Sequence, residues 1–145
     1  MGEKMDRKKI QLRIVTPRGV KIEEEADLIT MRCIDGDMGI LPGHSETSVA
    51  MGDGILRLSN EGNIQKIAVF GGVAEIKNDR VNIMTSIAQR PGEIDRPRAE
   101  TDRDQMEQLV QEKAGDLRIQ SQYVLLRRAL VRIEVSMHGY EEEEE

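Results

Sequence analysis

The stretch that decides the fold is ILRLSNEGNIQKIAVF, residues 55–70. Two apolar runs, at 55–58 and 64–70, flank the sequence Asn-Glu-Gly-Asn at residues 60–63. Short apolar runs are typical of strands, and Asn and Gly tolerate the backbone conformations of a tight reversal. We therefore predict a β-hairpin whose turn lies at residues 60–63.

The same pattern recurs on both sides of this hairpin. Apolar residues alternate at positions 10–14, which in a strand places them on one face. Apolar residues at 73–76 and 81–87 flank Asn78-Asp79, which predicts a second hairpin. Short strands separated by turns every ~8–12 residues favour a β-sandwich or a β-barrel.

The periodicity changes after Gly92. Asp95 is a typical helix N-cap, and Pro97 fits the first turn of a helix, where no N–H is needed. A second helix is predicted beyond Gly115, because apolar residues recur there at spacings of four and three: Ile119, Tyr123, Leu126, Leu130, Ile133 and Met137. Since the connection is short, we predict an antiparallel helical hairpin.

The second helix carries more apolar residues than one partner helix can cover. Val124, Leu125, Ala129, Val131 and Val135 lie outside the stripe named above. A helix that is apolar over a wide arc needs more than one neighbour. The hairpin therefore packs either against the β-domain or against another protein.

The charge is unevenly distributed. The chain has 145 residues and a net charge of −6, and residues 141–145 are five glutamates. Like charges with no apolar neighbours repel, so we expect residues 139–145 to form a disordered acidic tail. The near-neutral remainder, with 2% aromatic residues, lacks the basic surplus and stacking rings of a nucleic-acid binder. We expect no membrane span, no secretory signal and, with one cysteine, a reducing compartment.

Few residues suggest catalysis or metal binding. Cys33 alternates with core residues of a predicted strand, which favours a buried thiol over a nucleophile. Asp35-Gly36-Asp37 resembles the start of a calcium loop but lacks the distal glutamate, so we interpret it as a tight turn. With no nucleophile elbow or phosphate loop present, we predict a protein with no catalytic and no metal-ligating residues.

Two segments suggest binding. Residues 36–44 form a loop that carries Met38, Ile40 and Leu41 between glycines; these side chains either form a docking surface or turn inward to close the sandwich. At 94–99 the free N–H groups of a helix start favour anions, and Arg98, with Arg128 and Arg132 from the second helix, could hold phosphates. The alternative is that Asp95 is only a cap and the arginines are solvated or ion-paired.

These segments carry a resemblance. A β-sandwich, then Gly-Ile-Leu-Pro-Gly-His at 39–44, a Gly-Gly pair at 71–72, and Ile-Asp-x-x-Arg-Ala at 94–99 opening a helical hairpin closely resemble the epsilon subunit of bacterial F-type ATP synthase. The resemblance runs from about Ile10 to Met137. It implies a flexible N-terminus at 1–9, an all-β sandwich domain at 10–90, and a two-helix antiparallel hairpin at 94–138.

The resemblance also implies a function. The protein would be a non-catalytic rotor subunit of the central stalk, peripheral at the cytoplasmic face of the cell membrane, that binds the gamma subunit and the c-ring. Its implied contact residues are Asp37, Met38, Ile40, Leu41, Pro42 and His44. In an extended state the hairpin would reach the beta and alpha subunits and restrain ATP hydrolysis. An acidic segment of the beta subunit would then meet Arg118, Arg127, Arg128 and Arg132.

Some members of this family bind ATP as a regulatory ligand in the hairpin, although no cofactor is required. The residues that match their signature and its helix-two arginines are Ile94, Asp95, Arg98, Ala99, Arg128 and Arg132. Two positions depart, because Gln89 and Gln105 stand where those members have a glutamate and an arginine. Losing a cation weakens phosphate binding, by about 1–3 kcal/mol. The alternatives to a rotor subunit are a free-standing ATP-sensing module and a small β-sandwich enzyme.

Overall fold

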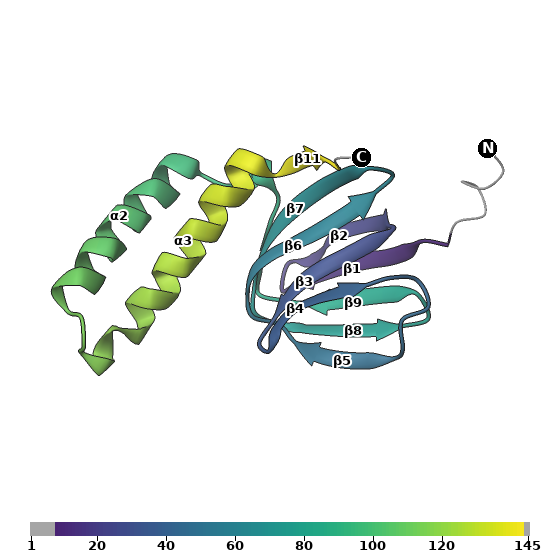
Figure 1. Ribbon diagram of the computed structural model, residues 1–145, viewed down its shortest axis with the longest axis horizontal. Coiled ribbons are helices and arrows are strands. Elements are labelled where there is room, and N and C mark those ends of the chain that lie inside the picture. Colours follow the sequence, from purple (N-terminus) through teal and green to yellow (C-terminus); the bar gives the residue numbers. More distant parts are fainter. Residues whose placement is uncertain (1–7, 144–145) are drawn as a thin grey trace.

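The computed structural model describes residues 8–143 as a β-sandwich followed by two packed helices (Figure 1). This arrangement confirms the predicted fold class. The two sheets lie face to face, and the helical pair projects from one end of the sandwich. Helix α3 (Gln120–His138) lies nearer the sheets than helix α2 (Arg96–Glu112).

Each sheet has a simple strand order. The first sheet contains, in spatial order, β2 (Gly19–Ala26), β1 (Ile10–Thr16), β9 (Arg80–Met84), β8 (Val73–Lys77) and β5 (Thr47–Ala50). The second contains β10 (Ile87–Gln89), β7 (Asn63–Phe70), β6 (Asp53–Asn60), β3 (Leu28–Cys33) and β4 (Gly36–Ile40), with β11 (Tyr140–Glu142) also paired to β7. The β1–β9 pair is parallel, and the other pairs are antiparallel.

Both predicted hairpins are present. Asn60 pairs with Asn63 across the β6–β7 turn, where Glu61 and Gly62 have positive φ angles of 50° and 84°. In the β8–β9 turn, Asn78 and Asp79 have φ angles of 52° and 58°. Two central residues with positive φ give a turn whose twist matches that of the strands, which is why Asn, Asp and Gly occur there.

The main core lies between the two sheets. Alternate residues of β1, such as Leu12 and Ile14, are at most 2% exposed, as the period-two spacing predicts. The predicted buried thiol is confirmed, because Cys33 lies in this core at 8% exposure. Burial raises the pKa of this thiol, and the carboxylates of Asp37 and Asp35 raise it further, which disfavours the reactive thiolate.

A smaller apolar cluster joins the helices to the sandwich. The end of β7 is buried on both faces, with Ile67 and Val69 in the main core and Ala68 and Phe70 facing outward toward α3. Val135 of α3 completes this cluster, with Ile55, Ile87, Ile94 and Val131 packed around it. The sequence allows two neighbours for the hairpin, the β-domain or another protein. In this structure the hairpin packs against the β-domain.

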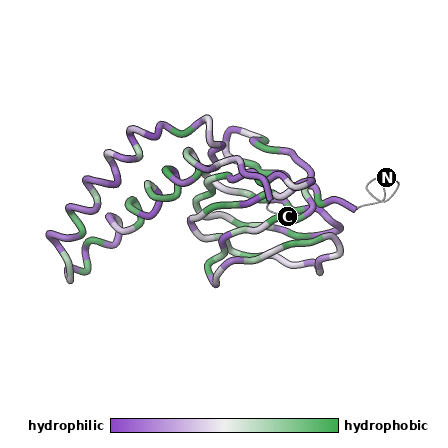
Figure 2. The backbone as a smooth tube through the Cα atoms, turned by 45° about the horizontal axis from the view of Figure 1, so that its top comes forward, coloured by the Kyte–Doolittle hydropathy of each residue, from purple (hydrophilic) through white to green (hydrophobic). Residues whose placement is uncertain are grey.

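The helices differ in how much apolar surface they cover. As predicted, Asp95 caps α2, because its Oδ1 accepts the Arg98 backbone N–H at 3.2 Å. Figure 2 shows α2 as largely hydrophilic, whereas apolar residues are more frequent on α3. Along the predicted stripe, Ile119 is buried while Tyr123, Leu130 and Met137 are 41%, 46% and 52% exposed. The stripe is only partly covered because α2 offers few apolar side chains.

The prediction of a disordered tail over 139–145 is wrong for Tyr140–Glu142, which form β11 against β7. Lys66 of β7 is 4% exposed, and its Nζ lies 2.8 Å from Glu141 Oε1 and 3.3 Å from Glu134 Oε1 of α3. A buried cation thus attracts the first glutamate of the tail and offsets its repulsion from its neighbours. Residues 144–145 lie outside the described residues.

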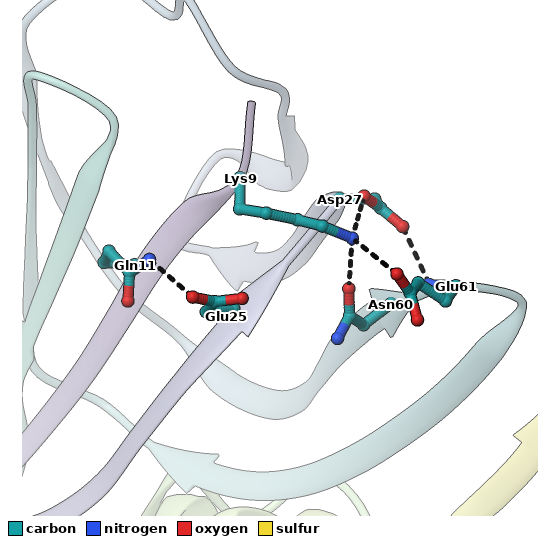
Figure 3. A network of polar contacts seen from close by, with 6 residues as sticks. All are labelled: Lys9, Gln11, Glu25, Asp27, Asn60 and Glu61. Carbon is teal, nitrogen blue, oxygen red and sulfur yellow. Dashed lines mark hydrogen bonds and ion pairs between the residues drawn. The ribbon is translucent and has the colours of Figure 1, made fainter. Parts of the chain in front are cut away.

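The predicted flexible N-terminus falls mostly on residues 1–7, which also lie outside the described residues. Lys9, by contrast, is held in a polar network (Figure 3). Its Nζ donates to Asp27 Oδ1 and Asn60 Oδ1, both at 2.7 Å, while the Glu61 backbone N–H donates to Asp27 Oδ2 at 2.8 Å. This network ties the start of β1 to the β6–β7 turn.

Candidate functional site

A cleft of about 330 Å³ opens where β10, the start of α2 and the side of α3 meet. We call it the nucleotide cleft, after the ligand that the sequence predicts for this region; its lining residues are Gln89, Glu93, Asp95, Arg98, Ala99, Asp102 and Arg132. Five of the seven residues predicted for nucleotide binding therefore lie together: Gln89, Asp95, Arg98, Ala99 and Arg132. The other two, Ile94 and Arg128, do not line the cleft.

Arg132 is fixed at the back of this cleft. Its Nε donates to Gln89 Oε1 at 2.8 Å, and its guanidinium lies 4.7 Å from the centre of the Phe70 ring. Burial lowers the pKa of Arg132 below its usual value, and the nearby Arg128 and Arg98 lower it further, against the opposing effect of Asp102. An arginine stays charged through such a shift, so Arg132 is a partly desolvated cation with N–H groups available to an anion.

Arg128, one turn earlier, is engaged elsewhere. Its Nε donates to Asp53 Oδ2 at 2.9 Å, and its guanidinium lies 5.2 Å from the centre of the same Phe70 ring. The Asp53 side chain is 11% exposed, which makes this a well-shielded ion pair between α3 and β6. Arg128 therefore holds the hairpin to the sandwich in this conformation.

The residues at the start of α2 have structural partners as well. Ile94 packs against the apolar cluster at Phe70, and Asp95 accepts the N-cap hydrogen bond. The second carboxylate oxygen of Asp95 can still accept a hydrogen bond from an amino group in the cleft. Capping and ligand binding are therefore compatible at this residue.

The charge of the cleft works against a polyanion. Glu93, Asp95 and Asp102 place three carboxylates in its lining against the two cations Arg98 and Arg132. Burial alone would raise the pKa of Glu93, but hydrogen bonds from the Lys21 ammonium and the Arg90 backbone outweigh it and lower that pKa. Glu93 is therefore ionised at neutral pH.

Sequence reasoning missed four residues of this region: Phe70, Asp53, Glu93 and Asp102. Glu93 and Asp102 lie close in sequence to the Ile-Asp-x-x-Arg-Ala motif. The charged residues on either side of the motif are therefore the signal that could have identified them. Phe70 and Asp53 lie on β7 and β6, far from the arginines in sequence. Only the packing of α3 against the sheet brings them together.

The predicted docking loop is wrong for residues 36–40, which form β4 against β3, and its side chains divide between the two interpretations. Ile40 is 1% exposed and Met38 packs against the main core, whereas Leu41 is 60% exposed. The loop is braced, because the Gly43 backbone N–H donates to Asp79 Oδ1 at 2.7 Å and the His44 N–H donates to the Leu41 carbonyl at 3.2 Å.

The remaining predicted loop residues lie at the surface. Asp37 is exposed and pairs with Arg32 at 3.3 Å, while Pro42 and His44 are half-buried. Leu41 is thus the apolar side chain that this loop presents to solvent.

The four arginines predicted to contact an acidic partner do not share one face. Arg118 forms an ion pair with Asp116 at 3.0 Å, and its side chain is 90% exposed. Arg127 is exposed, whereas Arg128 and Arg132 face Phe70. A common binding surface would therefore require α3 to leave the sandwich.

None of the helices within residues 8–143 is sufficiently long and apolar to cross a membrane.

Residues 9–91 match the family described as ATP synthase, Delta/Epsilon chain, beta-sandwich domain. The ATP synthase epsilon chain of Desulforamulus reducens is 34% identical over 126 residues, which cover 87% of this chain and 96% of that protein. The ATP synthase epsilon chain of Bacillus subtilis is 33% identical over 129 residues, covering 89% and 98% respectively.

Solved structures share the fold. A chain in the cryo-EM structure of the Euglena gracilis mitochondrial ATP synthase, described as OSCP/F1/c-ring, superposes with a TM-score of 0.72 at 24% identity, covering 92% of this chain and 86% of that one. A chain of the Tetrahymena thermophila mitochondrial ATP synthase central stalk and c-ring gives 0.51 at 12% identity, covering 61% and 72%.

Proposed function

Because this chain belongs to the ATP synthase delta/epsilon family, we propose that it works within the central stalk by binding the gamma subunit and the c-ring through its β-sandwich. It is an epsilon-type, non-catalytic subunit. The observation that carries the proposal is the match to epsilon chains over nearly their whole length. Such a subunit would be peripheral, held at the cytoplasmic face of the membrane by its partners.

The segment at residues 37–44, which is the end of β4 and the loop after it, is our proposed contact with gamma and the c-ring. What supports it is Leu41, an apolar side chain 60% exposed on a loop braced by Asp79. Leu41→Asp should reduce co-purification of the chain with gamma and the membrane sector, because a carboxylate would be buried in the interface. Val20→Asp, at a position 47% exposed on β2, is the matched control. Equal retention of both variants would contradict this contact.

We further propose that the hairpin restrains ATP hydrolysis when it leaves the sandwich and meets the beta and alpha subunits. What supports this proposal is the exposed apolar row Tyr123, Leu130 and Met137, which the β-domain does not cover. Removal of residues 94–145 should leave an assembled, coupled complex with raised ATPase activity. Unchanged hydrolysis would argue against inhibition by this hairpin.

ATP is the proposed regulatory ligand of the nucleotide cleft. The support is the convergence of Asp95, Arg98 and Arg132 on one cleft of about 330 Å³. Calorimetry of the isolated chain should detect ATP binding that Arg98→Gln weakens, with Arg96→Gln on the same turn as control. If no heat of binding is detected at millimolar ATP, the proposed ATP site is contradicted, and so is the alternative of a free-standing ATP sensor.

A further inference from the structure

A second cleft, of about 560 Å³, adjoins the nucleotide cleft on its sandwich side. Its lining runs from the β1–β2 turn (Thr16–Lys21) across Ser86–Gln89 to Arg132 of α3, and we call it the basic groove. Gln89 and Arg132, which are hydrogen-bonded to each other at 2.8 Å, line both clefts, so the two clefts adjoin at this pair of side chains. A ligand that crosses the pair contacts the linings of both clefts.

The two clefts differ in charge. Among the described residues that line it, the basic groove has three cations, Arg18, Lys21 and Arg132, and no carboxylate. The hydroxyls of Thr16 and Ser86 add neutral donors. The nucleotide cleft, by contrast, has three carboxylates and two cations. An anionic group placed at the junction is therefore drawn toward the sandwich and away from the start of α2.

The three cations of the basic groove differ in whether they already have partners within the protein. Lys21 forms an ion pair with Glu93, and Arg132 contacts Gln89 and Phe70. The Arg18 side chain makes no hydrogen bond or ion pair within residues 8–143. The turn that carries it is fixed, because Thr16 Oγ1 accepts the Arg18 backbone N–H at 3.3 Å and Gly19 has a φ of 112°.

We propose that the basic groove binds the phosphate chain of a nucleotide whose base and ribose lie in the nucleotide cleft. This inference rests on the proposed nucleotide binding and assigns its phosphate contacts to Arg18 and Lys21 of the β-sandwich as well as to Arg132. Guanidinium groups pair with phosphate oxygens through two N–H donors, and the ammonium of Lys21 adds a point charge. A ligand bound this way contacts the sandwich and α3 together and holds the hairpin against the sheet.

The test is calorimetry of the full chain with tripolyphosphate and, separately, with ATP. The double variant Arg18→Gln/Lys21→Gln should bind either ligand at least about tenfold more weakly than the wild type, because two charge-assisted contacts are lost. The control Arg13→Gln/Lys77→Gln removes the same charge from two exposed ion pairs, at 3.6 Å and 3.8 Å, that lie outside both cleft linings. Circular dichroism checks that all variants fold.

The outcomes separate the two proposals. The proposal for the basic groove is overturned if the wild type does not bind tripolyphosphate. It is also overturned if the double variant and the control lose the same affinity. ATP binding that the double variant leaves unchanged also overturns the groove but leaves nucleotide binding intact. If the wild type binds tripolyphosphate but not ATP, the groove is a site for free polyphosphate and the proposed nucleotide binding is contradicted.

Discussion

Gly72 has a backbone conformation that other residues rarely adopt. Its φ is 114°, and a Cβ there would overlap the Met84 carbonyl oxygen. Gly72→Ala should therefore destabilise the protein by roughly 2 kcal/mol, because both the backbone strain and the clash must be relieved. Urea unfolding measures this loss.

Gly92→Ala is the matched control for Gly72→Ala. A Cβ at Gly92 meets nothing within 4 Å, and its φ is unexceptional. This substitution should change the free energy of unfolding by less than about 1 kcal/mol. Equal effects of the two variants would contradict the packing described around Gly72.

Glu141 should make the stability of the protein depend on pH. A hydrogen bond from the Lys66 ammonium lowers its pKa below the ordinary 4.5; burial opposes this, and the charges of Lys66, His138 and Arg57 lower the pKa further. Because the folded-state pKa is the lower one, Glu141 stabilises the fold fully above about pH 5 and loses this effect as the pH falls through the folded value. Glu134, the other carboxylate beside Lys66, remains in place.

The measurement compares the unfolding midpoint of the wild type with that of Glu141→Gln. The wild type should be the more stable at pH 7, and the difference should close below about pH 4.5. Glu142→Gln, next along β11 and in no ion pair within residues 8–143, should show no such convergence. A constant difference across the pH range would show that Glu141 acts through packing instead.

Residues whose roles are local were predictable from the sequence, whereas residues that act across elements were not. Asp95 was identified as an N-cap because its carboxylate and the Arg98 backbone N–H that donates to it lie three residues apart. The stacking of Arg128 and Arg132 on Phe70 depends on how α3 packs against β7. No spacing along the chain encodes that contact.

At the scale of the elements, β11 covers part of the outer edge of β7. β10 pairs with the end of β7 at Ala68–Phe70, and β11 pairs with its start at Asn63–Gln65. The Lys66 backbone N–H between them donates to the Gly139 carbonyl at 2.7 Å. Without β11, the backbone groups at the start of β7 would face solvent.

A chain that ends at Gly139 should therefore lose amide protection at the start of β7. Hydrogen exchange should accelerate at Ile64, which is on the β11 side of β7 like Lys66, and spread into the last turn of α3, since the strand anchors that turn. A chain that ends at Glu143 keeps all of β11 and is the control. Unchanged exchange in the shorter chain would show that α3 alone protects this edge.

Some elements could be predicted from the sequence and others could not, for a physical reason. The hairpins at residues 60–63 and 78–79 were predicted because positive φ angles select Asn, Asp and Gly. β11 could not be predicted from the glutamates alone, because their mutual repulsion favours a disordered tail unless a cation elsewhere in the fold offsets it. Its partner, the buried Lys66, lies on a strand more than seventy residues earlier.

On the scale of the whole molecule, the two apolar clusters stabilise different parts: one the sandwich, the other the contact between the sandwich and the helices. The main core draws all of its nineteen buried residues from positions 10–88, so it does not depend on the helices. The second cluster has three buried members, of which Val135 belongs to α3. α2 reaches the sandwich mainly through α3, because α2–α3 is its principal contact. The helices should therefore unfold before the sandwich.

Urea unfolding of the full chain should show this order. The helical band of the circular dichroism spectrum should disappear at a lower urea concentration than the core methyl resonances of Ile14 and Ile83. A chain that ends at Arg90 should keep those resonances and lose roughly 1–3 kcal/mol of sandwich stability, because Phe70 becomes exposed. If the two probes of the full chain change together, the hairpin and the sandwich form one cooperative unit, and release of the hairpin would then require the sandwich itself to loosen.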